Sequence, residues 1–274
     1  MSTSLPRTLQ GLDALVRWWG RRTIAVALYL IDLTTFMIFA LRAWRGWHSL
    51  QLRSTRLQIV NQIIFTGVDA LPVILLLGLA VGISMTAQLL NLAVDFGTDK
   101  EMVDLVAVII GMELGSLITA IVLIGRSGSA IVVDLGNMKL HREVEGLEMV
   151  GIDINDMIVA PRLLGASISQ MALSVFFAGV ATFGGVAAAG LLLSSSYFRL
   201  IEPLLAAYTP AQIGAFLIKN LLFGLIIAGT ACFHALQVGV SPTEVPQQTQ
   251  RAIVNGLLLV FVLDGLFALA LAFA

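Results

Sequence analysis

The stretch GRSGSAIVVDLGNMKLHREVEGLEMVGID, residues Gly125–Asp153, lies between two strongly apolar parts of the chain. It begins with closely spaced glycines and contains five acidic side chains. A run of about 20 apolar residues can cross the hydrocarbon of a bilayer, whereas a charged stretch between two such runs belongs outside it. We therefore interpret Gly125–Asp153 as a polar connection between two membrane-spanning helices.

The composition of the whole chain supports this interpretation. Of its 274 residues, 58% are hydrophobic and 12% are charged, whereas a soluble domain carries about 25% charged residues. The mean hydropathy is +0.94. These values indicate an integral membrane protein, and a net charge of −1 without a basic tail gives no indication of nucleic-acid binding. The single cysteine, Cys232, excludes an internal disulfide and a cysteine metal cluster, and we expect no cleaved signal peptide.

Five segments are long and apolar enough to span a bilayer as helices. We expect an all-α membrane protein with spans at Ala70–Val94, Met102–Gly125, Met157–Leu193, Ala211–Leu236 and Ala252–Ala274. Glycines four residues apart let membrane helices approach closely. We therefore expect tight helix packing at Gly78 with Gly82 and at Gly111 with Gly115.

A sixth apolar segment, Thr23–Leu41, has arginines at both ends. Basic residues favour the cytoplasmic side of a membrane, so a segment with arginines at each end is poorly suited to crossing it. We interpret it as a helix in the plane of the interface, where indole side chains also prefer to lie; a sixth span is the alternative. The flanking residues are Arg21, Arg22, Arg42 and Arg45, with Trp18, Trp19, Trp44 and Trp47 beside them.

The distribution of basic residues predicts the orientation of the spans. Eight arginines precede Gln58, and Arg126, Lys139, Arg142 and Arg162 lie between the second span and the first turns of the third, whereas the loops on the opposite side hold Lys100 and Arg199. Because positive charge is retained on the cytoplasmic side, we expect a cytoplasmic N-terminus and a C-terminus on the outer side.

The Gly125–Asp153 stretch has features of three kinds of reactive site. A phosphate-binding loop requires a lysine after its last glycine, and none follows Gly128; a zinc protease requires histidines on one helix face, and the three histidines are scattered. The run Gly125 to Gly128 also matches the Gly-x-Ser-Gly pattern of rhomboid-like intramembrane proteases. In that alternative, Ser127 would be the nucleophile and His234 the base.

Three charged residues lie inside the apolar spans, namely Glu113, Lys219 and Asp264. A charge at the centre of a bilayer costs at least about 2.5–3.5 kcal/mol, so such residues pair or line a polar cavity. Counting along the spans places Lys219 and Asp264 at similar depths, with Glu113 about one helical turn deeper. We expect Lys219 and Asp264 to be partners, with Glu113 close to them at the edge of a cavity for a lipid headgroup.

A series of residues between Glu113 and Arg162 resembles the MlaE/YrbE family. Members of this family are the permease subunits of ABC transporters that move lipids between membranes. The resemblance is densest over about 50 residues and includes Glu113-Leu114-Gly115, Thr119-Ala120, Gly125-Arg126, Gly128-Ser129-Ala130, Leu135-Gly136, Met138, Glu148-Met149, Asp153 and Pro161-Arg162. It implies a homodimeric permease that has no catalytic site of its own. It also implies a partner ATPase that holds ATP and magnesium, an MCE-domain lipid-binding protein in the periplasm and a small STAS-type accessory subunit.

The resemblance also assigns a role to the polar connection. A short helix at about residues 140–151 would dock on the ATPase, through Arg142, Glu143, Glu145, Glu148 and Met149. The second span would leave the membrane at a break formed by Gly125, Arg126 and Gly128. On this basis we divide the chain into an N-terminal region, residues 1–60, and a permease domain, residues 61–274, in a bacterial inner membrane.

The sequence departs from the family pattern at several positions. Many members have Arg-Glu-Leu-Gly-Pro where this chain has Met112-Glu113-Leu114-Gly115-Ser116. The missing arginine weakens the assignment of a headgroup contact to Glu113. An alternative from another class is a secondary transporter driven by protons through Glu113 and Asp264.

Overall fold

The computed structural model describes residues 7–43, 53–96, 112–193 and 209–272. These residues form helices, without a strand in any of the four ranges. They belong to an all-α membrane protein, as predicted. In these ranges, six helical segments are long and apolar enough to cross a membrane: Gly20–Arg42, Thr55–Gln88, Met112–Leu140, Asn155–Gly185, Pro210–Ala235 and Glu244–Ala270.

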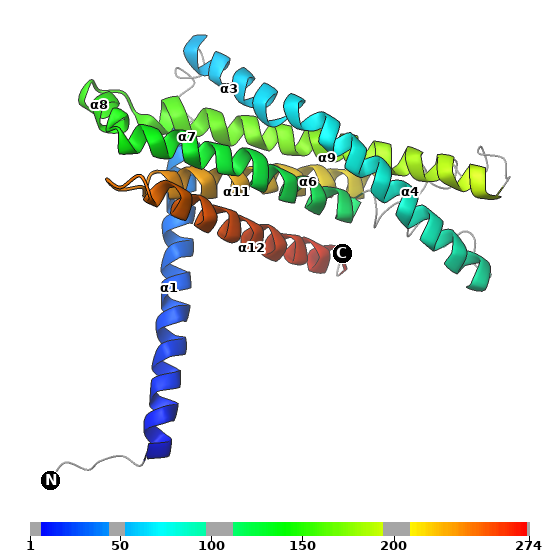
Figure 1. Cartoon of the computed structure of the whole chain (residues 1–274), viewed down its shortest axis with the longest axis horizontal. Helices are drawn as coiled ribbons and strands as arrows, with labels where there is room; N and C mark the ends of the chain where they lie inside the picture. Colours follow the sequence, from blue (N-terminus) through cyan, green and yellow to red (C-terminus); the bar gives the residue numbers. More distant parts are fainter. Residues whose placement is uncertain (1–6, 44–52, 97–111, 194–208, 273–274) are drawn as a thin grey trace.

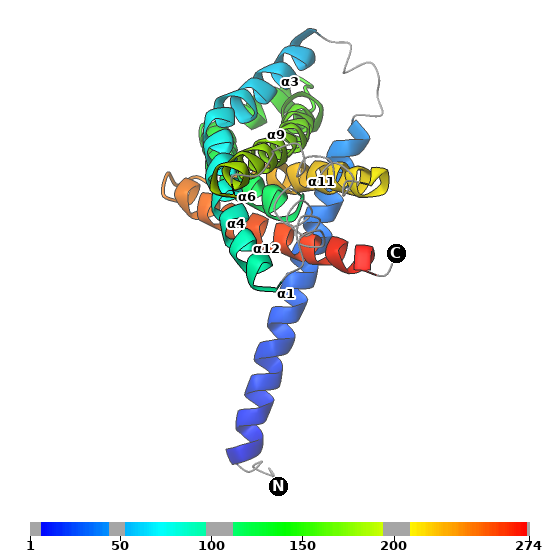
Figure 2. The ribbon, with the colours of Figure 1, turned by 90° about the vertical axis from the view of Figure 1, so that its right-hand side faces the viewer.

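The first of the six segments belongs to a helix that differs in direction from the rest. Helix α1, Arg7–Ala43, runs across the bundle rather than along it and contacts helices α9, Ala160–Leu193, and α11, Pro210–Ala235 (Figures 1 and 2). A helix that lies across a set of membrane spans is oriented in the membrane plane. This direction favours the interfacial interpretation of Thr23–Leu41 over a sixth span.

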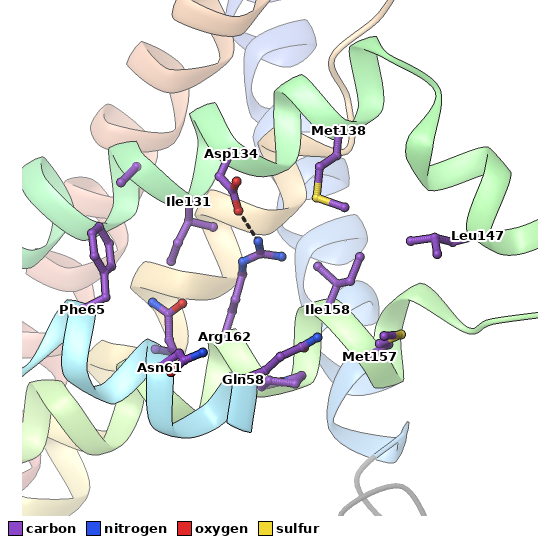
Figure 3. Close-up of a pocket in the computed structure, with 13 residues that line it drawn as sticks. Gln58, Asn61, Phe65, Ile131, Asp134, Met138, Leu147, Met157, Ile158 and Arg162 are labelled. Carbon is purple, nitrogen blue, oxygen red and sulfur yellow. Dashed lines mark hydrogen bonds and ion pairs between the residues drawn. The ribbon is translucent and has the colours of Figure 1, made fainter. Parts of the chain in front are cut away.

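The helix of the first expected span begins earlier than the sequence predicts. Helix α3, Arg53–Thr66, continues through a 3-10 turn, Val68–Ala70, into α4, Leu71–Phe96. Gln58, Asn61 and Gln62 of α3 line a cavity on one side of this helix (Figure 3). The expected span Ala70–Val94 therefore agrees with α4 within two residues, but the apolar helical segment that could cross the membrane begins earlier, at Thr55.

The expected break at Gly125 and Gly128 is also wrong. Helix α6, Gly115–Leu123, passes through a π-helical turn, Ile124–Gly128, into α7, Ser129–Leu140. Gly128 has right-handed helical angles, φ −60° and ψ −48°. Gly128 therefore does not use the left-handed backbone angles that glycine allows, and the helix continues. A π-helical turn is wider than an α-helical turn and holds one more residue. The expected start of this span at Met102 lies outside the described residues.

The remaining elements follow the predicted order. A short helix, α8, Glu143–Met149, joins α7 to a π-helical turn, Asn155–Val159, and then to α9. Helix α11 begins at a capping box in which Thr209 and Gln212 exchange hydrogen bonds between side chain and backbone. The last helix, α12, Glu244–Ala272, begins eight residues before the expected Ala252, and its C-terminal end lies away from α8 (Figure 1).

Glycines of α4 allow this helix to pack against the backbone of α9. A Cβ atom on Gly78 would lie 3.2 Å from the carbonyl oxygen of Phe177, and one on Gly82 would lie 2.1 Å from that of Ala181. Gly78 and Gly82 are four residues apart on α4, and so are Phe177 and Ala181 on α9. The two helices are therefore in contact over successive turns. The predicted close packing at Gly78 and Gly82 is confirmed, whereas Gly111 lies outside the described residues.

Candidate functional site

The three charged residues of the spans form one cluster. The Nζ atom of Lys219 in α11 lies 2.8 Å from Oε2 of Glu113 and 3.1 Å from Oδ1 of Asp264 in α12. The Lys219 side chain is 2% exposed, whereas those of Glu113 and Asp264 are 32% and 15% exposed. The predicted proximity of the three residues is confirmed. The sequence did not show that Lys219 bonds both acids at once.

This geometry explains how a buried lysine is tolerated inside an apolar bundle. An ammonium group donates up to three hydrogen bonds, and two carboxylates from different helices accept two of them. The cluster therefore joins α11 to α12 and to the helical segment before α6. Because both acids are partly exposed, the outer side of the cluster can also meet a polar group of another molecule.

A second polar group lies next to the charged cluster and was missed in the sequence. The amide of Asn220 donates to the hydroxyl of Ser116 at 2.9 Å, and its oxygen accepts from the hydroxyl of Ser174 at 2.6 Å and from Gln170 at 3.2 Å. All four side chains are buried. Their positions on α6, α9 and α11 connect these three helices by hydrogen bonds. The signal was present, because uncharged polar residues recur within apolar spans, but spacing does not show which of them meet.

Ser116 is the residue at which this chain differs from the proline of the family pattern. Its hydroxyl donates to the carbonyl oxygen of Met112 at 2.7 Å and accepts the hydrogen bond from Asn220. Proline has no hydroxyl, so this part of the network depends on the substitution. The Oε1 atom of Gln170 has no hydrogen-bond partner among the described residues.

Helix α8 presents most of its predicted coupling residues to the outside. Arg142, at its N-cap, has a positive φ of 60°, which turns the chain sharply after α7. Glu143, Glu148 and Met149 are exposed, and the Met149 side chain is 83% exposed. These residues are therefore free to face a partner.

Glu145 differs from the other acids of α8 because it has a partner within the chain. Its Oε1 atom lies 2.5 Å from Nζ of Lys139 at the end of α7. The hydrogen bond from Lys139 holds the pKa of the Glu145 carboxyl below its ordinary value. This pair fixes the corner between α7 and α8, so Glu145 has a structural contact that the sequence did not indicate.

Arg126 crosses from the π-helical turn to the junction between α3 and α4. Its Nη1 atom donates to the carbonyl oxygen of Phe65 at 2.8 Å, and its Nη2 atom lies 3.5 Å from Oδ2 of Asp69. The guanidinium also lies 5.3 Å from the centre of the Phe65 ring. Gly125 has no atom near the position of an added Cβ, and Gly128 would make only ordinary contacts. Of the three residues predicted to form the helix exit, Arg126 is thus the one whose side chain contacts another helix.

Ser127 and His234 do not form a nucleophile and base in the described part of the chain. The Oγ atom of Ser127 is buried without a hydrogen-bond partner there. The Nδ1 atom of His234 lies 3.0 Å from the amide oxygen of Gln248, and its Nε2 atom lies 3.1 Å from Asn255 and 3.2 Å from the hydroxyl of Tyr29. Since an amide oxygen only accepts, the proton is assigned to Nδ1, and both ring nitrogens are used. His234 joins α1 to α11 and α12, and the protease interpretation has no support.

The fold and these buried polar groups define a polytopic membrane protein in which charge is enclosed between spans. Residues 59–270 match the model of the family described as Permease MlaE, and the chain belongs to this family. It is 29% identical over 216 residues to the intermembrane phospholipid transport system permease protein MlaE of Haemophilus influenzae, covering 78% of this chain and 82% of that protein.

Two further relatives have a similar degree of identity to this chain. The chain is 28% identical over 221 residues to a probable ABC transporter permease protein of Synechocystis, covering 78% of this chain and 82% of the relative. It is also 28% identical over 209 residues to the chloroplastic protein TRIGALACTOSYLDIACYLGLYCEROL 1 of Arabidopsis thaliana, covering 75% of this chain and 59% of that protein. The family resemblance therefore extends over the spans and is not confined to the polar connection.

Proposed function

We propose that this chain is the permease subunit of an ABC transporter that moves phospholipids between the inner and outer membranes of a bacterium. The observation that carries this proposal is the family match over residues 59–270, together with coverage of 82% of a relative named as an intermembrane phospholipid transport permease. The chain would cross the inner membrane with its N-terminus in the cytoplasm and its C-terminus in the periplasm.

In this proposal the chain carries out no covalent chemistry. A partner ATPase would bind ATP and magnesium, and α8 would rest in a groove on its surface. The exposed acids Glu143 and Glu148 support this role, because charged groups on a short surface helix can pair with a partner without supporting the fold. The Lys139–Glu145 pair would hold α8 firmly on α7, so that movement of the ATPase is passed to the spans.

The lipid path would lie between two copies of the permease. The partly exposed Glu113 and Asp264 would stand at the edge of that path, where the charged cluster could contact a headgroup. An MCE-domain protein would accept or deliver lipid on the periplasmic side, and a small STAS-type subunit would bind the ATPase. Helix α1 would lie in the interface with its exposed apolar side chains, such as Ile24, Leu28 and Ile31, in lipid.

The proposal is tested by lipid transfer with purified components. The permease, its ATPase and the MCE protein would be reconstituted in vesicles containing a fluorescent phospholipid, and transfer to acceptor vesicles would be followed. We expect transfer that requires ATP and stops with an ATPase variant unable to hydrolyse it. Transfer by the permease alone, driven by a proton gradient, would instead indicate the secondary transporter.

A further inference from the structure

A cavity of about 610 Å³ lies between α3, α7 and α9, apart from the charged cluster. Figure 3 shows Arg162 reaching from α9 toward Asp134 of α7, while α3 closes the opposite side. Arg162 and Asp134 form an ion pair, and the Asp134 side chain remains 63% exposed. The volume lies within the range of about 300–1,000 Å³ that is usual for sites of small ligands.

The cavity lies near one end of the spans. Gln58 is three residues from the start of its span at Thr55, Asp134 is six residues from the end at Leu140, and Arg162 is seven residues from the start at Asn155. At about 1.5 Å per residue, these side chains are attached within about 10 Å of the span ends. This is the depth of lipid headgroups and glycerol rather than of the acyl chains.

The lining combines a polar part and an apolar part. Amide side chains of Gln58, Asn61 and Gln62 lie on α3, and apolar side chains from several elements complete the wall: Phe65, Ile131, Met138, Leu147, Met157 and Ile158. Asn61 and Phe65 are exposed on α3, so the cavity opens on the side of the bundle. This arrangement suits a molecule with a polar head and an apolar stem.

The two charged side chains of the lining, Arg162 and Asp134, indicate which lipid headgroup fits the cavity. Arg162 and Asp134 have opposite signs, so the cavity has no net charge from them, and an anion alone would meet the exposed carboxylate of Asp134. A zwitterion can present its phosphate to the Arg162 guanidinium and the amides, and its cation to Asp134. A primary ammonium donates hydrogen bonds to a carboxylate, whereas a quaternary ammonium cannot.

We propose that this cavity binds the headgroup of a phospholipid with a primary ammonium, taken from the leaflet on the α8 side. Its phosphate would lie at Arg162, its ammonium at Asp134 and its glycerol region against the apolar wall. The site requires only that the chain spans a membrane, so it can fail while the proposed transport stands, and the transport can fail while this site binds lipid.

The test is native mass spectrometry of the full-length chain with its ATPase, in micelles containing equal amounts of phosphatidylethanolamine, phosphatidylglycerol and phosphatidylcholine. Ala130 lines the cavity, and Ala130→Phe reduces its volume while Arg162 and Asp134 keep their own side chains. We expect the wild type to retain one more phosphatidylethanolamine per chain than this variant. Val133→Phe, at a position of α7 that is 43% exposed and outside the lining, is the matched control and should retain the wild-type number.

A second variant tests the headgroup itself. Asp134→Asn should lower the occupancy of that phosphatidylethanolamine about tenfold, because a hydrogen bond to a charged group is lost. Equal retention of the three lipids, or unchanged retention in both Ala130→Phe and Asp134→Asn, would overturn the proposal. Soluble phosphoethanolamine should not displace the lipid at equal concentration; displacement would show that the free headgroup is the ligand.

Discussion

Lys219 and Glu113, which are 106 residues apart in the sequence, make the shorter of the two contacts in the buried charged cluster. The contact of Lys219 with Asp264 is 3.1 Å long, against 2.8 Å for Glu113. Because one ammonium bonds two carboxylates, the three residues are not equivalent. Loss of Lys219 leaves two acids without their cation, whereas loss of Asp264 leaves the Lys219–Glu113 pair in place.

This asymmetry predicts the order of stability among variants. Lys219→Met should destabilise the permease by about 3–5 kcal/mol, and Asp264→Leu should cost clearly less. Changing only Lys219 and Asp264 would leave Glu113 unpaired, so recovery should require Glu113→Leu as well. Thermal unfolding in detergent measures the loss of stability in each variant and its recovery in the triple variant. Co-purification of the ATPase shows whether each variant still assembles. Equal destabilisation by Lys219→Met and Asp264→Leu would contradict the asymmetry, and wild-type stability of both variants would show that the cluster does not hold the bundle together.

The exposed acids of α8 predict a defect in assembly without a defect in folding. Reversal of charge by Glu143→Lys together with Glu148→Lys should weaken binding of the ATPase at least tenfold, because contacts to charged groups contribute about 1.5–3 kcal/mol each. The expected unfolding temperature is that of the wild type, since both side chains are exposed. Co-purification of the ATPase at wild-type stoichiometry would contradict the coupling role of α8.

The Lys139–Glu145 pair predicts a dependence of the α7–α8 corner on pH. The pKa of Glu145 is lowered in the folded chain, so its contribution to stability is fully present above the pKa of an unfolded glutamate. That contribution is lost as pH falls through the lower folded pKa. Hydrogen exchange of the α8 amides should therefore be constant between about pH 7 and 5, after correction for the intrinsic rate, and rise in more acidic buffer. Glu145→Gln should remove this dependence; the same rise in that variant would assign it to another group.

The close approach of α4 and α9 predicts a strong effect of side-chain size at Gly82. A Cβ at this position would lie 2.1 Å from the carbonyl oxygen of Ala181, so Gly82→Ala should force the helices apart. The expected cost is about 1–3 kcal/mol of unfolding free energy. Gly179→Ala on α9 is the matched control, since an added Cβ there meets nothing within 4 Å. Similar unfolding temperatures for the two variants would refute the tight contact.

The surroundings of Ser127 predict that its hydroxyl is dispensable. The buried Oγ atom has no hydrogen-bond partner in the described part of the chain, so Ser127→Ala removes an unsatisfied polar group. Stability should be unchanged or slightly higher, and lipid transfer should remain near the wild-type rate. Loss of all transfer by a normally assembled variant would restore the hypothesis of a reactive serine.

Much of the fold could be predicted because membrane burial leaves a strong signal in the sequence. The apolar runs indicated the spans of α9 and α11 closely, and the cost of buried charge correctly brought Lys219 and Asp264 together. The errors lay at the ends of the spans. The helix that holds the first span extends back through α3, and the cavity that Gln58 and Asn61 line is not visible in the sequence.

The sequence by itself determined that this is an all-α membrane protein, which charged residues must be paired, and which stretch joins the spans as a polar connection. These properties follow from transfer of side chains between water and hydrocarbon, which depends on each segment alone. Only the tertiary structure showed that Lys219 forms ion pairs with two acids and that Glu145 forms an ion pair with Lys139. It also showed that the helix continues through the glycines beside Arg126. These contacts depend on which helices meet and in what register, and residues far apart in the chain set both.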